Sequence, residues 1–150
     1  PLEAIAIADR LKRDFGHNIA VHYYGDGPLR QEIINYAEQL SVTAIFHGFD
    51  INYLTSLGSE DVVLHCSNSE GLSRSCMECL AKNVRLISRN WLGCEELINN
   101  GENGLIYSTE AEAVKLFAEY FLSGKLKKSF LLPKNDVKVG VKTFITAIEK

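Results

Sequence analysis

Hydrophobic and polar residues follow two alternating periods along the chain. Short runs rich in β-branched residues predict strands at 19–24, 44–47, 61–66, 84–88 and 104–107. Segments with a helical spacing of apolar residues predict helices at 1–14, 28–40, 51–57, 73–82, 94–99, 110–123 and 137–149. Strands that alternate with helices this regularly favour an α/β fold, a Rossmann-like parallel sheet with helices on both faces.

The first predicted element is a helix, whereas a doubly wound sheet starts with a central strand. We therefore expect residues 1–150 to be a single domain that lacks its first strand and is a fragment of a longer polypeptide. With the absent strand counted, the strand order 3-2-1-4-5-6 would bring the loop after 61–66 into the ligand-binding crevice. Residues 67–71 in this loop are therefore the first place to look for a site.

The stretch from 68 to 83, NSEGLSRSCMECLAKN, carries two carboxylates on the way into a predicted helix. The backbone N–H groups of Gly71, Leu72 and Ser73 would open this helix, where unpaired donors and the helix dipole suit phosphate or sugar oxygens. Glu70 is negative and should prefer hydroxyl donors, as on a sugar. Glu78, eight residues on, returns to within about 80° of the same face. Such a pair could hold two ends of an extended polyol ligand.

Each carboxylate also has a plainer interpretation. Glu70 can be an acid that the positive end of the helix dipole favours, and Glu78 can be a solvated residue on an exposed face. The neighbours Met77 and Cys79 instead predict that Glu78 faces the core, where a carboxylate needs a partner. The residues alone leave both interpretations open.

Composition adds mainly exclusions. The chain has 150 residues, 46% hydrophobic and 23% charged, which is typical of one globular domain. The net charge is −3, and Lys and Arg are scattered, so the basic footprint of a nucleic-acid-binding protein is missing. No apolar run approaches the roughly 18 residues of a membrane span.

Four cysteines stand at positions 66, 76, 79 and 94. The Cys76–Cys79 pair lies within a predicted helix, without a second pair or clustered histidines, so a zinc site or a redox pair is the weaker interpretation. We expect reduced thiols packed in a core, as in a cytoplasmic protein, and no metal.

Several motifs occur in order between about residues 20 and 108. They are GDGPLR at 25–30, FHG at 46–48, SNSEGL at 67–72 followed by Glu78, VRLI at 84–87, GCEELI at 93–98 and NGLI at 103–106. As a set, they resemble the C-terminal half of family 4 glycosyltransferases, a retaining group with the two-domain GT-B fold. The resemblance implies transfer of a hexosyl group from a nucleotide diphosphate sugar to a glycan, a lipid-linked glycan or a protein.

The resemblance also implies roles for single residues. Glu70 would hold hydroxyls of the donor sugar at the catalytic centre, and Glu78 would bind the ribose of the nucleotide. Backbone amides of Gly71, Leu72 and Ser73 would contact the sugar and diphosphate, with the base near His47 and Gly48. The chain departs from the family at Cys79, where alanine is usual, and at Asn83, where proline is usual.

In this family no metal or other cofactor is normally required. The cationic residues that neutralise the diphosphate, and the N-terminal acceptor-binding domain, lie outside this chain. The resemblance thus implies a donor-binding fragment that is inactive alone. The whole enzyme would be cytoplasmic, either free in the cytoplasm or at the inner face of the membrane. Peripheral membrane association through the absent half stays open.

Two other functions share this fold. A nucleotide-sugar 2-epimerase has different motifs, and GCEELI followed by NGLI argues against it. A non-catalytic scaffold derived from a glycosyltransferase would be favoured by loss of Glu70 or Glu78, and both are present.

Overall fold

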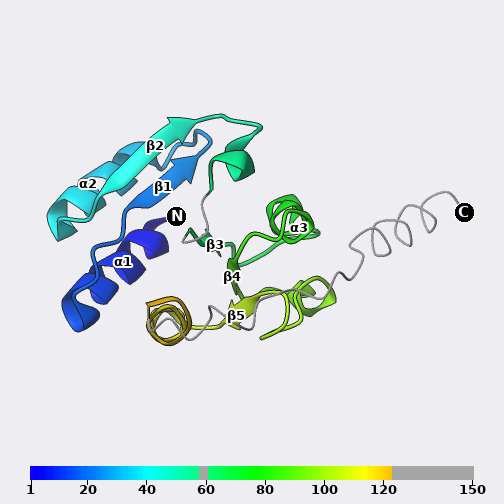
Figure 1. Ribbon diagram of the computed structural model, residues 1–150. Coiled ribbons are helices and arrows are strands. Elements are labelled where there is room, and N and C mark those ends of the chain that lie inside the picture. Colours follow the sequence, from blue (N-terminus) through cyan, green and yellow to red (C-terminus); the bar gives the residue numbers. More distant parts are fainter. Residues whose placement is uncertain (58–60, 123–150) are drawn as a thin grey trace, which may run out of the picture.

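The computed structural model describes residues 1–57 and 61–122 of the chain, and within them every predicted element is present (Figure 1). The helices are α1 (Leu2–Phe15), α2 (Arg30–Leu40), α3 (Arg74–Ala81) and α4 (Glu110–Leu116), with two short 3-10 helices, η1 (Tyr53–Ser56) and η2 (Cys94–Glu96). The strands are β1 (Val21–Tyr24), β2 (Ala44–Gly48), β3 (Val63–His65), β4 (Leu86–Arg89) and β5 (Leu105–Tyr107). Helix α4 continues as a π-helical segment, η3 (Phe117–Leu122). The helix predicted at 137–149 lies outside the described residues.

The strands form two parallel sheets, β1–β2 and β3–β4–β5. Within each sheet the neighbours agree with the expected order 3-2-1-4-5-6, since β1 pairs with β2, and β4 lies between β3 and β5. Among the described residues no strand joins β1 to β3. The parallel α/β fold is therefore confirmed, with the sheet divided at the position where the sequence analysis expected a strand (Figure 1).

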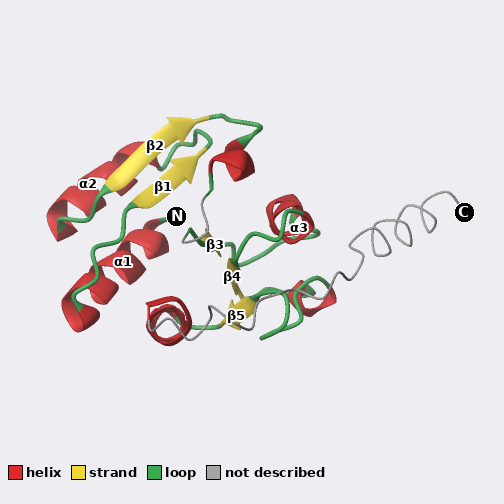
Figure 2. Cartoon of the chain, in the orientation of Figure 1, coloured by secondary structure: helices red, strands yellow, loops and turns green. Residues whose placement is uncertain are grey.

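Helix α1 connects the two sheets. Ile5 packs with Ile33 and Ala37 of α2 over the β1–β2 sheet. Two other residues of α1, Ile7 and Leu11, pack with β4, β5 and α4. Figure 2 shows α1 and α2 side by side on one side of the β1–β2 sheet. One helix thus contributes to two cores, which explains how the divided sheet holds together.

The three-stranded sheet carries helices on both faces, as predicted. Leu86 and Ile87 are neighbours on β4 and point to opposite faces, as successive residues of a strand do. Ile87 packs against α1 and α4, whereas Leu86 packs against Cys76, Cys79 and Leu80 of α3. The two α3 cysteines are free and have no exposed surface, so their predicted packing in a core is confirmed.

Candidate functional site

Glu70 lies in the loop between β3 and α3 and contacts the last residue of β3. Its Oε1 is 3.3 Å from Nε2 of His65, and its side chain is 30% exposed. The hydroxyl of Ser73 lies 3.1 Å from the same Nε2. A short loop between a strand and a helix folds back on the strand end, so His65 contacts both residues.

The other nitrogen of His65 reaches the neighbouring strand. Nδ1 is 3.1 Å from the hydroxyl of Ser88 on β4, which is fully buried. Ser88 also accepts a hydrogen bond of 3.3 Å from Nε1 of Trp91. Glu70 therefore stands at the exposed end of a polar network that runs into the core through His65.

The start of α3 lies beside Glu70. Ser73 is the N-cap, and its hydroxyl accepts a bond of 3.4 Å from the amide of Cys76. Of the three residues predicted to open the helix, Ser73 caps it, while Gly71 and Leu72 precede it and are exposed. The helical turn itself starts at Arg74, one residue later than predicted. A side chain built on Gly71 would meet no atom within 4 Å, so the space in front of this helix end is open.

Glu78 has a different setting from the one that its neighbours predicted. It is exposed, and the core-facing interpretation is wrong, because the buried face of α3 is formed by Cys76, Cys79 and Leu80. The carboxylate still has a specific partner, since the Tyr53 hydroxyl donates a hydrogen bond of 3.1 Å to Oε2. Burial, the Cys79 thiol and the Glu78 carboxylate, in that order, raise the pKa of Tyr53 above its usual value of 10.0.

His47 and Gly48 end strand β2 close to this tyrosine. The His47 ring stacks on Tyr24 at 4.4 Å between centroids, and Tyr24 in turn lies 5.5 Å from the Tyr53 ring. His47 Nε2 is 2.9 Å from Nδ1 of His22. Gly48 has a φ of 70° and accepts a bond of 2.6 Å from the Gly25 amide, which joins the loops after β1 and β2. A row of rings thus connects His47 with the partner of Glu78.

Comparison with known proteins decides the family. The model of the family described as "Glycosyl transferases group 1" matches residues 1–130. The chain belongs to this family. A search of curated protein sequences finds no match.

Two solved structures share the fold of this group 1 glycosyl transferase chain. The apo form of the lipopolysaccharide outer core galactosyltransferase WaaB superposes with a TM-score of 0.62 at 18% identity, over 75% of this chain and 33% of that one. The structure of a GtfA/B complex gives a TM-score of 0.50 at 21% identity, over 78% of this chain and 24% of that one. The likeness supports the GT-B fold, and the chain spans about a third and a quarter of these two proteins.

Four of the seven sequence-predicted site residues of this transferase chain fall into two networks, and Gly48, Gly71 and Leu72 belong to neither. Glu70 and Ser73 join His65, Ser88 and Trp91, whereas Glu78 and His47 join Tyr53 and Tyr24. Sequence reasoning missed His65 and Tyr53. His65 had a usable signal, because a polar residue at the end of a strand beside a candidate loop is placed to contact that loop. Tyr53 had no such signal.

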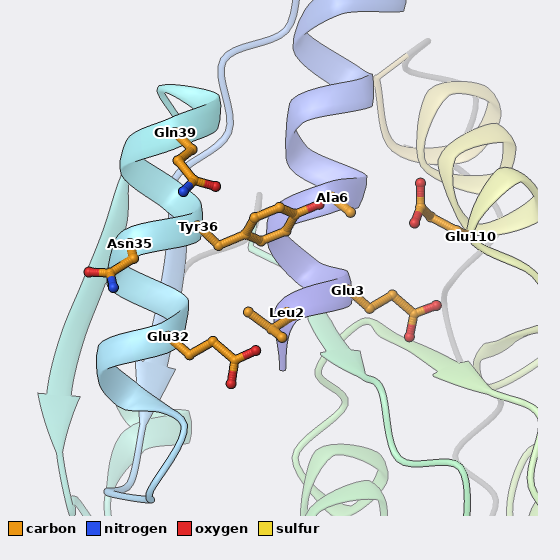
Figure 3. Close-up of a pocket in the computed structure, with 8 residues that line it drawn as sticks. All are labelled: Leu2, Glu3, Ala6, Glu32, Asn35, Tyr36, Gln39 and Glu110. Atoms are coloured by element: carbon orange, nitrogen blue, oxygen red, sulfur yellow. The ribbon is translucent and has the colours of Figure 1, made fainter.

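A pocket of about 590 Å³ lies elsewhere, on the helical side of the molecule. Figure 3 shows it between α1 and α2, with Tyr36 extending from α2 toward α1. Its rim includes Glu3, Glu32 and Glu110, and none of the predicted site residues lines it. Among the described residues, no helix could cross a membrane and no cluster of His, Cys, Asp and Glu could hold a metal.

Proposed function

We propose that this chain is the nucleotide-sugar-binding part of a retaining family 4 glycosyltransferase. The enzyme would transfer a hexosyl group from a nucleotide diphosphate sugar to a glycan, a lipid-linked glycan or a protein. The observation that carries the proposal is the position of Glu70, at the carboxyl end of β3 beside the open N-terminal end of α3. Membership of the group 1 glycosyl transferases supports it.

The donor's sugar and diphosphate belong at the start of α3 in this proposal. Glu70 is partly exposed and would accept hydrogen bonds from sugar hydroxyls. Backbone N–H groups of Gly71, Leu72 and Ser73 would donate to sugar and phosphate oxygens. At the N-terminus of a helix, unpaired N–H donors and the positive end of the helix dipole both favour such oxygens. The empty space beside Gly71 leaves room for this approach.

The nucleoside belongs at the second network. Glu78 would bind the ribose hydroxyls, with the Tyr53 hydroxyl fixing the orientation of its carboxylate. The base would lie near His47 and Gly48, at the end of β2. The exposure of Glu78 supports this role, because an exposed carboxylate can reach a ligand at the surface.

The catalytic work in this reaction is stabilisation of the departing diphosphate, where negative charge develops. We expect cationic side chains from the remainder of the enzyme to share this task with the α3 amides, and no metal to be needed. The acceptor would bind to another domain of the same polypeptide. The chain alone is then expected to bind donor with negligible turnover.

Calorimetry on the full-length transferase with a panel of nucleotide diphosphate sugars tests the proposal. We expect one donor to bind, and Glu70→Ala and Glu78→Ala each to weaken it about tenfold to a hundredfold, as loss of a hydrogen bond to a charged group does. Glu78→Ala should also lower the affinity for the bare nucleoside diphosphate, whereas Glu70→Ala should leave that affinity unchanged.

The matched control is Glu38→Ala, which removes an exposed carboxylate from α2, and should leave every affinity unchanged. If no donor binds, or if Glu70→Ala and Glu78→Ala behave like the control, the proposal is wrong. A non-catalytic scaffold then becomes the better hypothesis.

A further inference from the structure

His65 is the residue through which Glu70 is attached to the fold. Its side chain is only 10% exposed, and both ring nitrogens lie within hydrogen-bond distance of partners. The Trp91 ring packs edge-on at 6.4 Å between centroids. The ring therefore cannot reorient without breaking contacts to three elements: β4, the loop after it, and the start of α3.

The partners determine where the ring carries its hydrogen. An ionised Glu70 carboxylate can only accept, so Nε2 of His65 must be the donor across the 3.3 Å contact. The Ser73 hydroxyl then accepts from the same N–H or donates to Ser75, whose hydroxyl is 3.1 Å away. The contact with Glu70 thus selects the form of His65 with hydrogen on Nε2.

Ser88 is the hydrogen-bond partner of the other ring nitrogen, Nδ1, and is compatible with a hydrogen on Nε2. Its oxygen accepts from Trp91, and its single hydrogen can go either to Nδ1 of His65 at 3.1 Å or to the Arg89 carbonyl at 3.0 Å. In the first case Nδ1 accepts, and His65 is neutral with its hydrogen on Nε2. In the second, Nδ1 donates. The bond to Glu70 requires a hydrogen on Nε2, whereas a ring with hydrogen on Nδ1 alone would accept from the Ser73 hydroxyl at Nε2 and lose this bond.

Only one oxygen of Glu70 is used in this way. In the part of the chain that the structure describes, Oε2 has no hydrogen-bond partner, while Oε1 faces His65. A bond from a rigid donor to one oxygen restricts the rotamers of a carboxylate, so a ligand has fewer of them to select from. The other oxygen stays available to a ligand, in the loop that leads directly into α3.

We propose that His65 is a positioning residue, which orients the Glu70 carboxylate toward the sugar of the donor by a hydrogen bond from Nε2. This inference rests on the proposed function of Glu70 as the sugar-binding carboxylate. His65 itself does not contact the donor in this proposal. It acts through Glu70, so its removal should change binding of the sugar and leave binding of the nucleoside unaffected.

Two variants of the full-length transferase distinguish the hydrogen bond made by Nε2 of His65 from the one made by Nδ1. In His65→Gln the side-chain amide reaches about as far as Nε2 and can still donate to Glu70. In His65→Asn the amide reaches only as far as Nδ1, so the bond to Ser88 can form and the bond to Glu70 cannot. We expect His65→Asn to weaken the affinity for the nucleotide sugar about tenfold. The affinity of His65→Gln should stay within about threefold of that of the wild type.

Three further readouts exclude a merely structural effect. Both variants should bind the bare nucleoside diphosphate as wild type does and should unfold at a similar temperature. Adding His65→Asn to Glu70→Ala should cause no further loss, because the two residues act in series. Equal losses in the Gln and Asn variants, or a loss of nucleoside diphosphate affinity in either, would overturn the proposal.

A measurement without donor separates this proposal from the proposed function. Nitrogen-15 spectra of labelled histidine should show hydrogen on Nε2 of His65, with a resonance that Glu70→Ala shifts and that Glu78→Ala does not. The signals of His22 and His47 should be unchanged by Glu70→Ala. If His65 carries its hydrogen on Nδ1 alone, the positioning role is wrong even if a donor binds. If Nε2 is protonated and coupled to Glu70 while no donor binds, the bond between His65 and Glu70 is correct, and the proposed function fails together with the role in orienting Glu70 toward a sugar.

Discussion

At the scale of single residues, one step along α3 separates a solvent-facing carboxylate from a core thiol. Glu78 is exposed, and Cys79 has no exposed surface. Successive helical residues differ in direction by about 100°, so apolar neighbours in sequence do not imply a buried side chain. This explains why the predicted core position of Cys79 is confirmed, while of the two interpretations of Glu78 the exposed one holds and the core-facing one is wrong.

Burial of Cys79 leads to a prediction about pH. Burial first, then the nearby Cys76 and Glu78, raises the pKa of Cys79 from 9.0 to about 12. Above pH 9 the unfolded chain therefore loses this proton while the folded chain keeps it, and the free energy of unfolding falls between pH 9 and 12. The decrease from one such group approaches about 1.4 kcal/mol per pH unit.

Urea unfolding at a series of pH values from 7 to 10 would measure this effect. Burial also raises the pKa of Cys66 and Cys76, so these thiols add to the decrease. Cys79→Ala should lower stability at pH 7 because it leaves a cavity, and should make the decline above pH 9 less steep. Identical slopes for wild type and Cys79→Ala would contradict the prediction.

At the scale of elements, the short helical segments depart most from expectation. The segments predicted as helices at 51–57 and 94–99 are single 3-10 turns, and the helix predicted at 110–123 changes to a π-helical segment after Leu116. Apolar spacing indicates that a segment is helical, but over one turn it does not distinguish among helix types.

The C-terminal caps of α1 and α2 give a paired prediction. Both caps are left-handed, at Gly16 with φ 72° and at Ser41 with φ 52°. Glycine adopts this conformation without steric strain, whereas serine does not. Gly16→Ala should destabilise the protein by about 1 kcal/mol, and Ser41→Gly should stabilise it by roughly 0.5 kcal/mol after the entropy of the unfolded glycine is counted.

Thermal and urea unfolding of both variants would check these signs. No atom lies within 4 Å of a side chain built at Gly16, so its expected cost is conformational rather than steric. The Ser41 carbonyl accepts a 2.9 Å bond from Lys12, which glycine would retain. A shift of the same sign in both variants would show that the caps do not control these helix ends.

At the scale of the whole molecule, α1 connects two sheets that do not pair with each other in the described residues. Its first turn adds a polar connection to its apolar contacts. Arg89, the last residue of β4, binds both carboxylate oxygens of Glu3, and the Tyr107 hydroxyl donates a 3.3 Å bond to the same carboxylate. These bonds join α1 to the carboxyl ends of β4 and β5.

Removing the Glu3 charge should weaken this connection. The side chains of Glu3 and Arg89 are 16% and 26% exposed, so solvent screens the pair only in part. We expect Glu3→Gln to lower the free energy of unfolding by about 1–3 kcal/mol, because Arg89 keeps its charge in a partly buried place. Urea unfolding would measure the loss.

Glu38→Gln is the matched control, since Glu38 is exposed on α2, and it should change stability by no more than about 0.5 kcal/mol. If Glu3→Gln is as stable as this control, the ion pair contributes nothing and the apolar faces of α1 alone join the sheets.

The sequence by itself determined the alternation of strands and helices, the parallel sheets and the burial of the α3 cysteines. These features follow from the local spacing of apolar residues, which is present in the sequence itself and does not depend on how the elements pack. The ordered motifs also indicated a glycosyltransferase, and membership of the group 1 glycosyl transferases is confirmed, whereas the assignment to family 4 stays a prediction. The roles of Glu70, Glu78 and His47 in donor binding stay predictions.

Only the tertiary structure decided which partner each candidate residue has. Tyr53 reaches Glu78 across 25 positions of sequence, and Arg89 reaches Glu3 across 86. Even His65, five residues from Glu70, depends on Ser88 of another strand for its orientation. Such contacts depend on how elements pack against one another, and a local pattern of polar and apolar residues carries no record of that packing.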